Sequence, residues 1–290
     1  MAVGIMGYGT YTPQTRMDAS EIAERSGIPE NVIREKFGVQ SKPIPGEGDT
    51  TSAMAVAAAK NAIHSAGIEP RDIDLLIYNG GQHKDYPNWL AGLKIAHELG
   101  ADRAWSFDME AMCGSMIAGF EVARSLMESN EEYRTVVLAS GYRNGDMIDF
   151  DVKETSFMFD LGAGGAAVVL RRDLGRNEIL STAFRGDGSF AEDCVVEVGG
   201  AAKWPPQPED ASRMHFVLRD VDSFKRKLGE RTLPNFYHVI HDALGKAGRT
   251  REDIDYLAVL HFKRSTHTAV LRELGLTEEQ TTYLEHHGHV

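Results

Sequence analysis

One cysteine of this chain stands where a thiol could act as a nucleophile. Cys113 lies in DMEAMCGSMIAG, residues 108–119, directly before small and apolar residues with helical spacing. At the N-terminus of a helix, unpaired backbone N–H groups and the helix dipole favour a thiolate. Gly114 and Ser115 leave room for a substrate to approach. The alternative is a buried thiol that packs as a small apolar side chain, and the local sequence does not decide between the two.

A helix terminus alone is too weak to ionise this thiol. Lowering the pKa of a cysteine from about 8.5 to about 7 takes roughly 2 kcal/mol. An exposed helix end contributes roughly 0.3–1 kcal/mol. A second polarising group is therefore required, and histidine is the expected type. Cys194, in AEDCVVEV, has no helix after it, so we expect that cysteine to be structural.

Composition narrows the class of protein. The chain has 290 residues, of which 42% are hydrophobic, as in ordinary globular proteins. Its net charge of −12 argues against nucleic-acid binding, because phosphates have to be met by excess lysine and arginine. Two cysteines make no disulfide framework, and no apolar run approaches the ~18 residues of a membrane span. With no signal-peptide pattern at its start, the sequence predicts a cytoplasmic protein without a membrane or metal site.

Strand and helix patterns alternate along the chain. The stretch TSAMAVAAAKNAIHSAG, residues 51–67, is typical of an alanine-rich helix that ends at a glycine. Short β-branched and apolar runs bounded by turn residues predict buried strands at 73–80, 133–140 and 163–172. This alternation predicts an α/β fold with a partly parallel sheet.

A repeat divides the chain into two halves. AIHSAGIEPRDIDLLIY begins at Ala62, and the similar ALGKAGRTREDIDYLAV begins at Ala243, 181 positions later. Both copies read helix, glycine, turn, Asp-Ile-Asp and buried strand, which indicates an internal duplication. We therefore predict one half at 1–172 and a second at 173–290, packed together because no linker-like stretch separates them.

The chain resembles the β-ketoacyl-acyl-carrier-protein synthase III branch of the thiolase superfamily. The resemblance is carried, in order along the chain, by GYGTYTP (7–13), AMCGSMIAGFEVA (111–123), FMFDLGAGGAAVVL (157–170) and IDYLAVLHFKR (254–264). It implies a thiolase-like αβαβα layered fold built from two βαβαβαββ halves, in agreement with the repeat. The glycine-rich segment has no phosphate-loop spacing, so we interpret it as close backbone packing.

The resemblance also implies an activity and its residues. Such enzymes use an acylated cysteine, here Cys113, and a histidine, here His261, in a decarboxylative Claisen condensation of an acyl thioester with a malonyl thioester. The reaction belongs to fatty acid biosynthesis. Its substrates are carried on coenzyme A or an acyl carrier protein, no cofactor is bound permanently, and family members are homodimers.

The end of the chain departs from the family pattern. His289, in YLEHHGHV, falls where the family has asparagine. An imidazole can also donate a hydrogen bond to an oxyanion, so His289 is a candidate catalytic residue; alternatively, it is an exposed member of a histidine-rich tail. Family members continue beyond the position of Val290, through strands that complete the second half. We therefore expect a truncated second half.

The coenzyme A site departs as well. VIREKFGV (32–39) lacks the stacking tryptophan of the family and leaves Lys36 as a phosphate contact, with Arg264 as a second candidate. The cluster SFKRKLGER (223–231) is either a solvated helix face or a docking patch for an acidic carrier protein.

Two other functions stay open at this point. The chain could transfer the acyl group without decarboxylation, or run thiolytically, which the altered residues at His289 and the coenzyme A site suggest. It could also be a non-catalytic partner subunit that keeps the fold.

Overall fold

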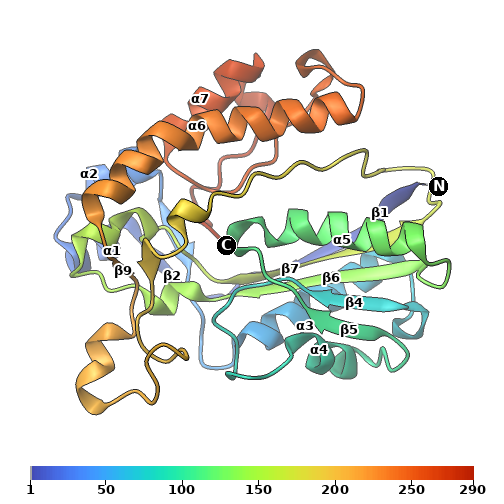
Figure 1. Ribbon diagram of the computed structural model, residues 1–290, viewed down its shortest axis with the longest axis horizontal. Helices are drawn as coiled ribbons and strands as arrows, with labels where there is room; N and C mark the ends of the chain where they lie inside the picture. The colour runs from blue at the N-terminus through green and yellow to red at the C-terminus, as the bar shows by residue number, and fades with distance from the viewer. Residues whose placement is uncertain (1) are drawn as a thin grey trace.

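The computed structural model describes residues 2–290, and its first half is built on a five-stranded mixed sheet (Figure 1). The strand order is β1-β7-β6-β4-β5. The parallel strands are β4 (Leu75–Tyr78), β5 (Trp105–Asp108) and β6 (Thr135–Tyr142). β7 (Gly164–Arg172) runs antiparallel to β6, and β1 (Val3–Tyr11) antiparallel to β7. The predicted α/β class is thereby confirmed.

Helices cover both faces of this sheet. α3 (Thr51–Ala66) and α4 (Ala91–Leu99) lie on one face, and α5 (Ser115–Ser129) lies on the other (Figure 1). Chain order from β1 to β7 therefore follows the predicted βαβαβαββ pattern. Alternate strand residues face opposite ways, as the period of a strand requires. Leu76 belongs to the core beneath α3, whereas its neighbour Ile77 belongs to the core beneath α5.

The glycine-rich segment packs its backbone closely against α3. A Cβ atom at Gly165 would lie 2.3 Å from the carbonyl oxygen of Met54. At Gly9, on the neighbouring strand β1, a Cβ atom would lie 2.3 Å from the backbone nitrogen of Ala62. Only glycine permits this approach, so the predicted backbone packing is confirmed for this segment.

A smaller group of elements flanks one end of the sheet. It comprises β2 (Arg16–Asp18), α1 (Ala19–Ser26), α2 (Glu30–Val32) and β3 (Ser41–Pro43). After α2 the chain widens into a π-helical turn, Ile33–Phe37, and leaves it at Gly38 with φ 76°. The left-handed backbone there suits glycine, and it directs the carbonyl oxygen of Gly38 toward the second half of the chain.

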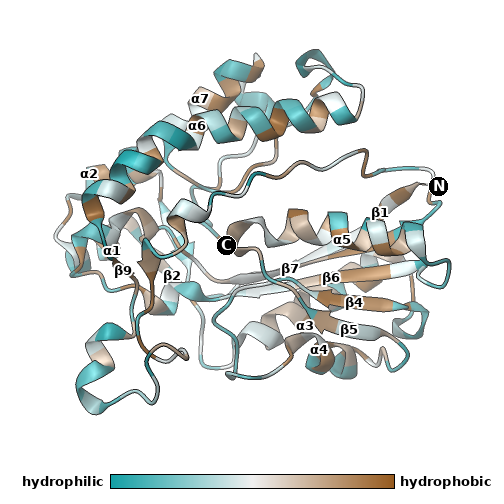
Figure 2. Cartoon of the chain, viewed as in Figure 1, coloured by the Kyte–Doolittle hydropathy of each residue, from teal (hydrophilic) through white to brown (hydrophobic). Residues whose placement is uncertain are grey.

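Residues after β7 supply helices above α5 (Figure 1). β8 (Cys194–Val195) and β9 (Val217–Leu218) form a short antiparallel pair, followed by the long helix α6 (Val221–Lys246) and by α7 (Arg264–Leu274). Figure 1 shows α6 crossing the molecule above α5. In Figure 2, β4 and β6 are hydrophobic along most of their length, whereas α6 is largely hydrophilic on the face in view.

The buried strand predicted after Asp-Ile-Asp in the second copy of the repeat is not formed, so that prediction is wrong. Leu257 makes an isolated parallel bridge with Thr281, and Tyr256 is 52% exposed. Leu257 is the repeat counterpart of Leu76, which pairs in parallel with Ser106 in the first sheet. Within residues 173–290 as described, this bridge has no flanking strands equivalent to β6 and β7, and strands need such neighbours for stability. The division at residue 172 stays a prediction.

Every helix within residues 2–290 is too short or too polar to cross a lipid bilayer.

Candidate active site

Cys113 lies at the junction between β5 and α5, directly before the helix as the sequence predicts. The tight turn Met112–Gly114 makes this junction, and Met112 takes the left-handed conformation with φ 50°. Such a conformation costs roughly 1–2 kcal/mol for a residue with a Cβ atom. The Ser115 hydroxyl stabilises it by accepting a hydrogen bond from the Ala111 N–H (2.9 Å) and donating one to the Met112 carbonyl (2.7 Å). The strained turn is therefore fixed from within the helix.

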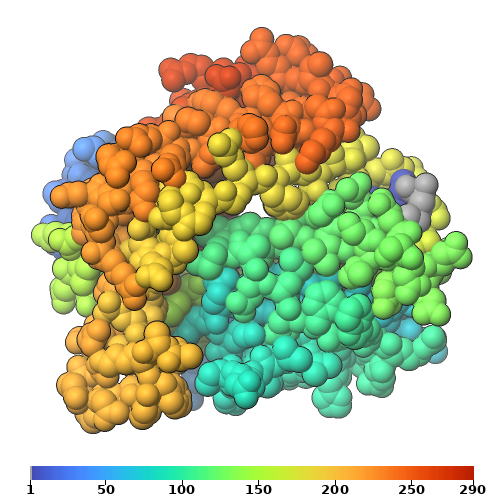
Figure 3. All heavy atoms as spheres, viewed as in Figure 1, coloured from blue at the N-terminus to red at the C-terminus, as the bar shows by residue number. Residues whose placement is uncertain are grey.

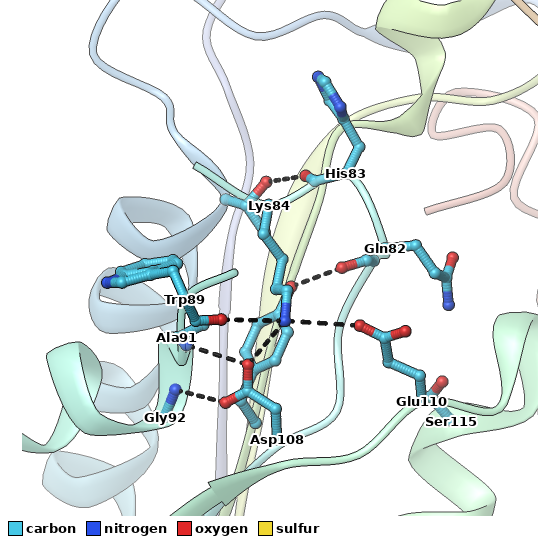
Figure 4. Close-up of polar contacts among 12 residues, drawn as sticks. Gln82, His83, Lys84, Trp89, Ala91, Gly92, Asp108, Glu110 and Ser115 are labelled. Carbon is cyan, nitrogen blue, oxygen red and sulfur yellow. Dashed lines mark hydrogen bonds and ion pairs between the residues drawn. The ribbon is translucent and has the colours of Figure 1, made fainter. Parts of the chain in front are cut away.

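A polar cluster anchors the segment that leads to this turn. The Lys84 ammonium lies 2.9 Å from Asp108 and 3.6 Å from Glu110, as Figure 4 shows. The Asp108 carboxylate also accepts hydrogen bonds from the backbone N–H groups of Ala91 and Gly92 at the start of α4. The cluster thus links the end of β5 to the loop after β4 and to α4. It thereby holds the segment that leads to Cys113.

A cavity of about 620 Å³ opens beside the cysteine. Figure 3 shows the surface hollowed between α6 and the start of α5. The polar groups of its wall include Cys113, Asp160, His261 and His289, which come from four separate segments. Much of the remaining wall is apolar and includes Phe37, Phe157, Leu228, Leu233, Phe236 and Phe262. Two exposed cations, Lys225 and Lys263, complete it.

His289 is held at the cavity by its backbone. Its N–H donates to the carbonyl oxygen of Asp160 (2.9 Å), and its own carbonyl accepts from the N–H of Gly162 (2.9 Å). The preceding Gly288 has φ 64°, and a Cβ atom there would lie 2.1 Å from the Asp160 carbonyl oxygen. The ring nitrogen Nδ1 of His289 lies 3.2 Å from the His261 carbonyl oxygen and donates to it. Nε2 is then the nitrogen left for the thiol.

The thiol and the His289 imidazole shift each other's pKa. Cys113 is an exposed residue, not a buried apolar thiol. Partial loss of water around the sulfur raises its pKa, but the hydrogen bond and the charge of His289 outweigh that effect, so the pKa lies below its ordinary value. Burial lowers the pKa of His289, but the hydrogen bond and the charge of Cys113 outweigh it, so that pKa is raised. Both directions favour a thiolate–imidazolium pair. By contrast, burial and then the charge of Asp193 raise the pKa of Cys194 to about 11.

His261 is bound on both sides of its ring. The side chain is buried, with Nδ1 2.8 Å from the Asp160 carboxylate and Nε2 3.2 Å from the Gly38 carbonyl oxygen. The ring of Tyr283 lies 5.0 Å from that of His261, centroid to centroid. The Tyr283 ring is in turn covered by the guanidinium of Arg264 at 4.4 Å. His261 therefore forms part of the cavity wall as a fixed group.

Asp160 is the site residue that sequence reasoning missed. It stands within the glycine-rich segment 157–170, which the sequence indicates only as a region of close packing. The one available signal was a carboxylate beside glycines in a segment otherwise made of apolar residues. Its partner His261 is 101 positions away, so no local pattern could connect them.

The candidate phosphate contacts lie next to the cavity rather than in its wall. Lys36 and Arg264 adjoin the lining residues Phe37 and Lys263 in sequence, but neither lines the cavity.

The predicted basic cluster on α6 is divided in the structure. Lys227 pairs with Asp193 and Arg231 with Asp187, whereas Arg226 lies 3.7 Å from Glu230. Of this cluster, Lys225 lines the cavity.

Comparison with known proteins finds sequence similarity to β-ketoacyl-[acyl-carrier-protein] synthase III. Residues 107–188 match the family model of 3-oxoacyl-[acyl-carrier-protein (ACP)] synthase III. The β-ketoacyl-[acyl-carrier-protein] synthase III of Rhizorhabdus wittichii is 27% identical over 278 residues, covering 95% of this chain and 82% of that protein. The enzyme of the same name from Wolbachia pipientis is 32% identical over 197 residues, or 68% of this chain and 60% of that protein.

Solved structures confirm the fold. The 3-oxoacyl-(acyl carrier protein) synthase III of Pseudomonas aeruginosa superposes with a TM-score of 0.85 at 20% identity, covering all of this chain and 85% of that one. OleA of Xanthomonas campestris, solved with bound lauric acid and lauroyl-CoA, superposes with a TM-score of 0.81 at 20% identity, covering all of this chain and 87% of that one. The thiolase-like fold that the resemblance implied is therefore confirmed.

Proposed function

We propose, from the premise that this chain is a thiolase-fold protein similar to β-ketoacyl-[acyl-carrier-protein] synthase III, that it is an acyltransferase working through an acyl-cysteine. It condenses an acyl thioester with a malonyl thioester and releases carbon dioxide. The observation that carries the proposal is the convergence of Cys113, His261 and His289 on one cavity. These residues come from segments far apart in the sequence, and two of them shift each other's pKa toward the reactive pair.

The first half-reaction transfers the acyl group to Cys113. The thiolate sulfur attacks the thioester carbonyl, and the backbone N–H of Cys113 at the start of α5 supports the charge on the tetrahedral oxygen. When the C–S bond of the donor breaks, the leaving sulfur takes the proton of the His289 imidazolium. The products are acyl-Cys113, a free thiol and neutral His289.

The second half-reaction forms the carbon–carbon bond. The malonyl group loses carbon dioxide, and the electron pair of the broken bond passes into an enolate whose charge lies on the thioester oxygen. His261 stabilises that oxygen by hydrogen bonding. The enolate carbon attacks the acyl carbonyl, and Cys113 leaves as a thiolate. Uptake of one proton from solvent restores the His289 imidazolium.

The walls of the cavity suit a thioester on a long arm. Its apolar side chains pack against methylene groups, and the cations Lys225 and Lys263 can meet a phosphate or the malonyl carboxylate. Both coenzyme A and an acyl carrier protein present a thioester on a phosphate-bearing arm. Lys36 and Arg264 are proposed as further phosphate contacts just outside the cavity, with no permanently bound cofactor.

Intact mass spectrometry tests the proposal. The native chain is incubated with a panel of acyl-coenzyme A and acyl-carrier-protein thioesters, beside Cys113→Ala and Cys194→Ala. We expect a mass gain equal to the acyl group in the native chain and in Cys194→Ala, and none in Cys113→Ala. Adding a malonyl thioester should remove the label and yield a β-ketoacyl thioester. Labelling that persists in Cys113→Ala, or no labelling by any donor, would overturn the proposal.

A second candidate is acyl transfer without decarboxylation. It is favoured by one observation: Nε2 of His261 donates to the carbonyl of Gly38 rather than pointing free into the cavity. If that bond persists when substrate binds, Cys113 and His289 alone would pass the acyl group to another thiol. Product analysis distinguishes the two functions, because transfer to a free thiol proceeds equally with or without malonyl thioester.

A homodimer in the cytoplasm completes the proposal. β5 lies at the edge of the sheet, where it pairs only with β4 among the described strands, and its Trp105 is 51% exposed. An edge strand with an exposed indole is a surface on which a second copy can pair. A cytoplasmic location keeps the reactive thiol reduced. Light scattering coupled to size exclusion measures the mass, and a monomer at all concentrations would contradict the dimer.

A further inference from the structure

We propose that Asp160 is a positioning residue that keeps His261 protonated on both ring nitrogens. His261 then acts as a charged hydrogen-bond donor to the enolate, while His289 alone serves the thiol. The inference rests on the proposed function and divides its two half-reactions between the two imidazoles.

The hydrogen bonds of His261 carry the argument. Nδ1 faces the Asp160 carboxylate at 2.8 Å, and Nε2 faces the Gly38 carbonyl at 3.2 Å. An ionised carboxylate and a carbonyl are both acceptors. A neutral imidazole has one donor and one lone pair, so it would set its lone pair against one of these oxygens. The doubly protonated ring donates to both.

The burial of Asp160 and His261 also favours a doubly protonated His261 ring. His261 is 1% exposed and Asp160 is 8% exposed. A buried carboxylate is costly unless an opposite charge and hydrogen bonds compensate it. Within residues 2–290, His261 is the ion-pair partner found for Asp160. The charge of Asp160 also acts on Lys42 and His289, but Lys42 donates its hydrogen bond to the Leu161 carbonyl, and His261 is the side chain hydrogen-bonded to the carboxylate in this part of the chain.

A purely structural ion pair is the alternative. A structural ion pair could lie anywhere in the fold. The Asp160–His261 pair instead lines the same cavity as Cys113 and His289. The two histidines are also linked, because His289 donates to the backbone carbonyl of His261. A buried charged pair in a cavity wall beside a polarised thiol is typical of a functional site.

The charge state fits the second half-reaction. As the carboxylate leaves as carbon dioxide, negative charge develops on the thioester oxygen, and Nε2–H of His261 shifts to that oxygen from Gly38. A charged donor binds an oxyanion more strongly than a neutral one. His261 neither gains nor loses a proton, and its counter-charge stays on Asp160 throughout.

The variant Asp160→Asn tests the inference, because asparagine keeps the shape of the side chain and removes its charge. We expect kcat for decarboxylation of a malonyl thioester to fall roughly 100-fold, as for loss of an oriented electrostatic group. Acylation of Cys113 should be unchanged or faster, since the charge of Asp160 opposes ionisation of the thiol. The matched control is Asp146→Asn, which removes a carboxylate 3.4 Å from His83, outside the cavity wall. It should leave both steps unchanged.

A double-variant cycle separates action through His261 from any direct role. In a His261→Gln background, Asp160→Asn should cost less than about twofold in decarboxylation. Decarboxylation within twofold of native in the single Asp160→Asn variant would overturn the inference. So would an equal slowing of both half-reactions in a folded variant, because that is the signature of a structural role.

A spectroscopic measurement keeps the inference testable if the proposed function fails. The ¹⁵N shifts of the His261 ring should show two hydrogen-bonding N–H groups in the native chain, as its contacts with Asp160 and Gly38 require, and one in Asp160→Asn. If no thioester acylates Cys113, the proposed function is wrong, and these shifts still decide the charge state of His261. A neutral His261 ring in the native chain would overturn the inference alone.

Discussion

The Nδ1 atom of His289 donates a hydrogen bond to the carbonyl oxygen of His261 across 3.2 Å. This contact joins the side chain of His289 to the backbone of His261. It also fixes which nitrogen of the His289 ring is available. Nε2 of His289 is left for the Cys113 thiol, whereas the His261 ring is held separately, by Asp160 at Nδ1 and by the Gly38 carbonyl at Nε2.

Alkylation of Cys113 should begin at lower pH than that of an ordinary thiol. The thiolate is the reactive form, and His289 lowers the pKa of Cys113. Replacing His289 by glutamine removes its charge, so the alkylation profile should move to higher pH. Iodoacetamide labelling followed by peptide mass spectrometry measures both profiles. Cys194 is the internal control, since its pKa of about 11 should delay its labelling to strongly alkaline pH. Identical profiles for native chain and His289→Gln would contradict the pairing.

Adding a methyl group at Gly288 should displace His289. Gly288→Ala places a Cβ atom 2.1 Å from the Asp160 carbonyl oxygen, at a residue with φ 64°. Gly248→Ala is the matched control, because Gly248 also has φ 64° but open space around its Cβ position. We expect Gly248→Ala to lose about 1 kcal/mol of unfolding free energy without affecting the thiol. Gly288→Ala should lose more and should also shift Cys113 alkylation to higher pH. Equal effects of the two substitutions on the thiol would show that the Gly288 turn does not position His289.

Buried Lys42 should make stability depend on pH above 8. Burial lowers the pKa of Lys42 from 10.5 to about 8, although the charge of Asp160 opposes the shift. Below pH 8 the ammonium is charged in both the folded and the unfolded chain, and its burial cost is fully present. Between pH 8 and 10.5 the folded chain binds fewer protons than the unfolded chain, so the unfolding free energy rises with pH.

The variant Lys42→Met lacks this dependence. The native chain should therefore gain about 3 kcal/mol of unfolding free energy relative to Lys42→Met between pH 8 and 10.5. Urea unfolding at several pH values measures the difference. A difference that stays constant, or that falls as pH rises, would refute the prediction.

Filling the cavity from α6 should block thioesters but not small reagents. Gly229 lines the cavity, and the space around its Cβ position is open. In Gly229→Trp the indole would occupy that space, so acylation by coenzyme A thioesters should slow at least about tenfold, since misplaced reactants lose rate steeply. Iodoacetamide should still label Cys113. Gly245 lies on the same helix but outside the cavity wall, and the space around its Cβ position is also open. Cys113 should therefore be acylated at the native rate in Gly245→Trp. Normal acylation in Gly229→Trp would mean that thioesters reach Cys113 by another route.

Local patterns were sufficient to predict several features of this protein. The spacing of apolar residues after Cys113 predicts α5, because a helix forms from interactions within a few turns of chain. The repeat pairs Leu76 with Leu257, and both residues make parallel contacts in the structure. The repeat could not show that the second contact would be a single bridge, since strand formation depends on neighbours supplied from elsewhere.

Only the tertiary structure decided which groups share the site. The sequence required a second polarising group for Cys113 and offered both His261 and His289; the folded chain puts His289 beside the thiol and His261 against Asp160. The basic residues of α6 looked like one patch in sequence, yet Lys227 and Arg231 are paired with aspartates from an earlier loop. In each case the partner lies tens of residues or more away, and such contacts are set by the path of the whole chain rather than by local spacing. The sequence by itself therefore determined the thiol and the helix that follows it, while the charges around that thiol were assigned by the fold.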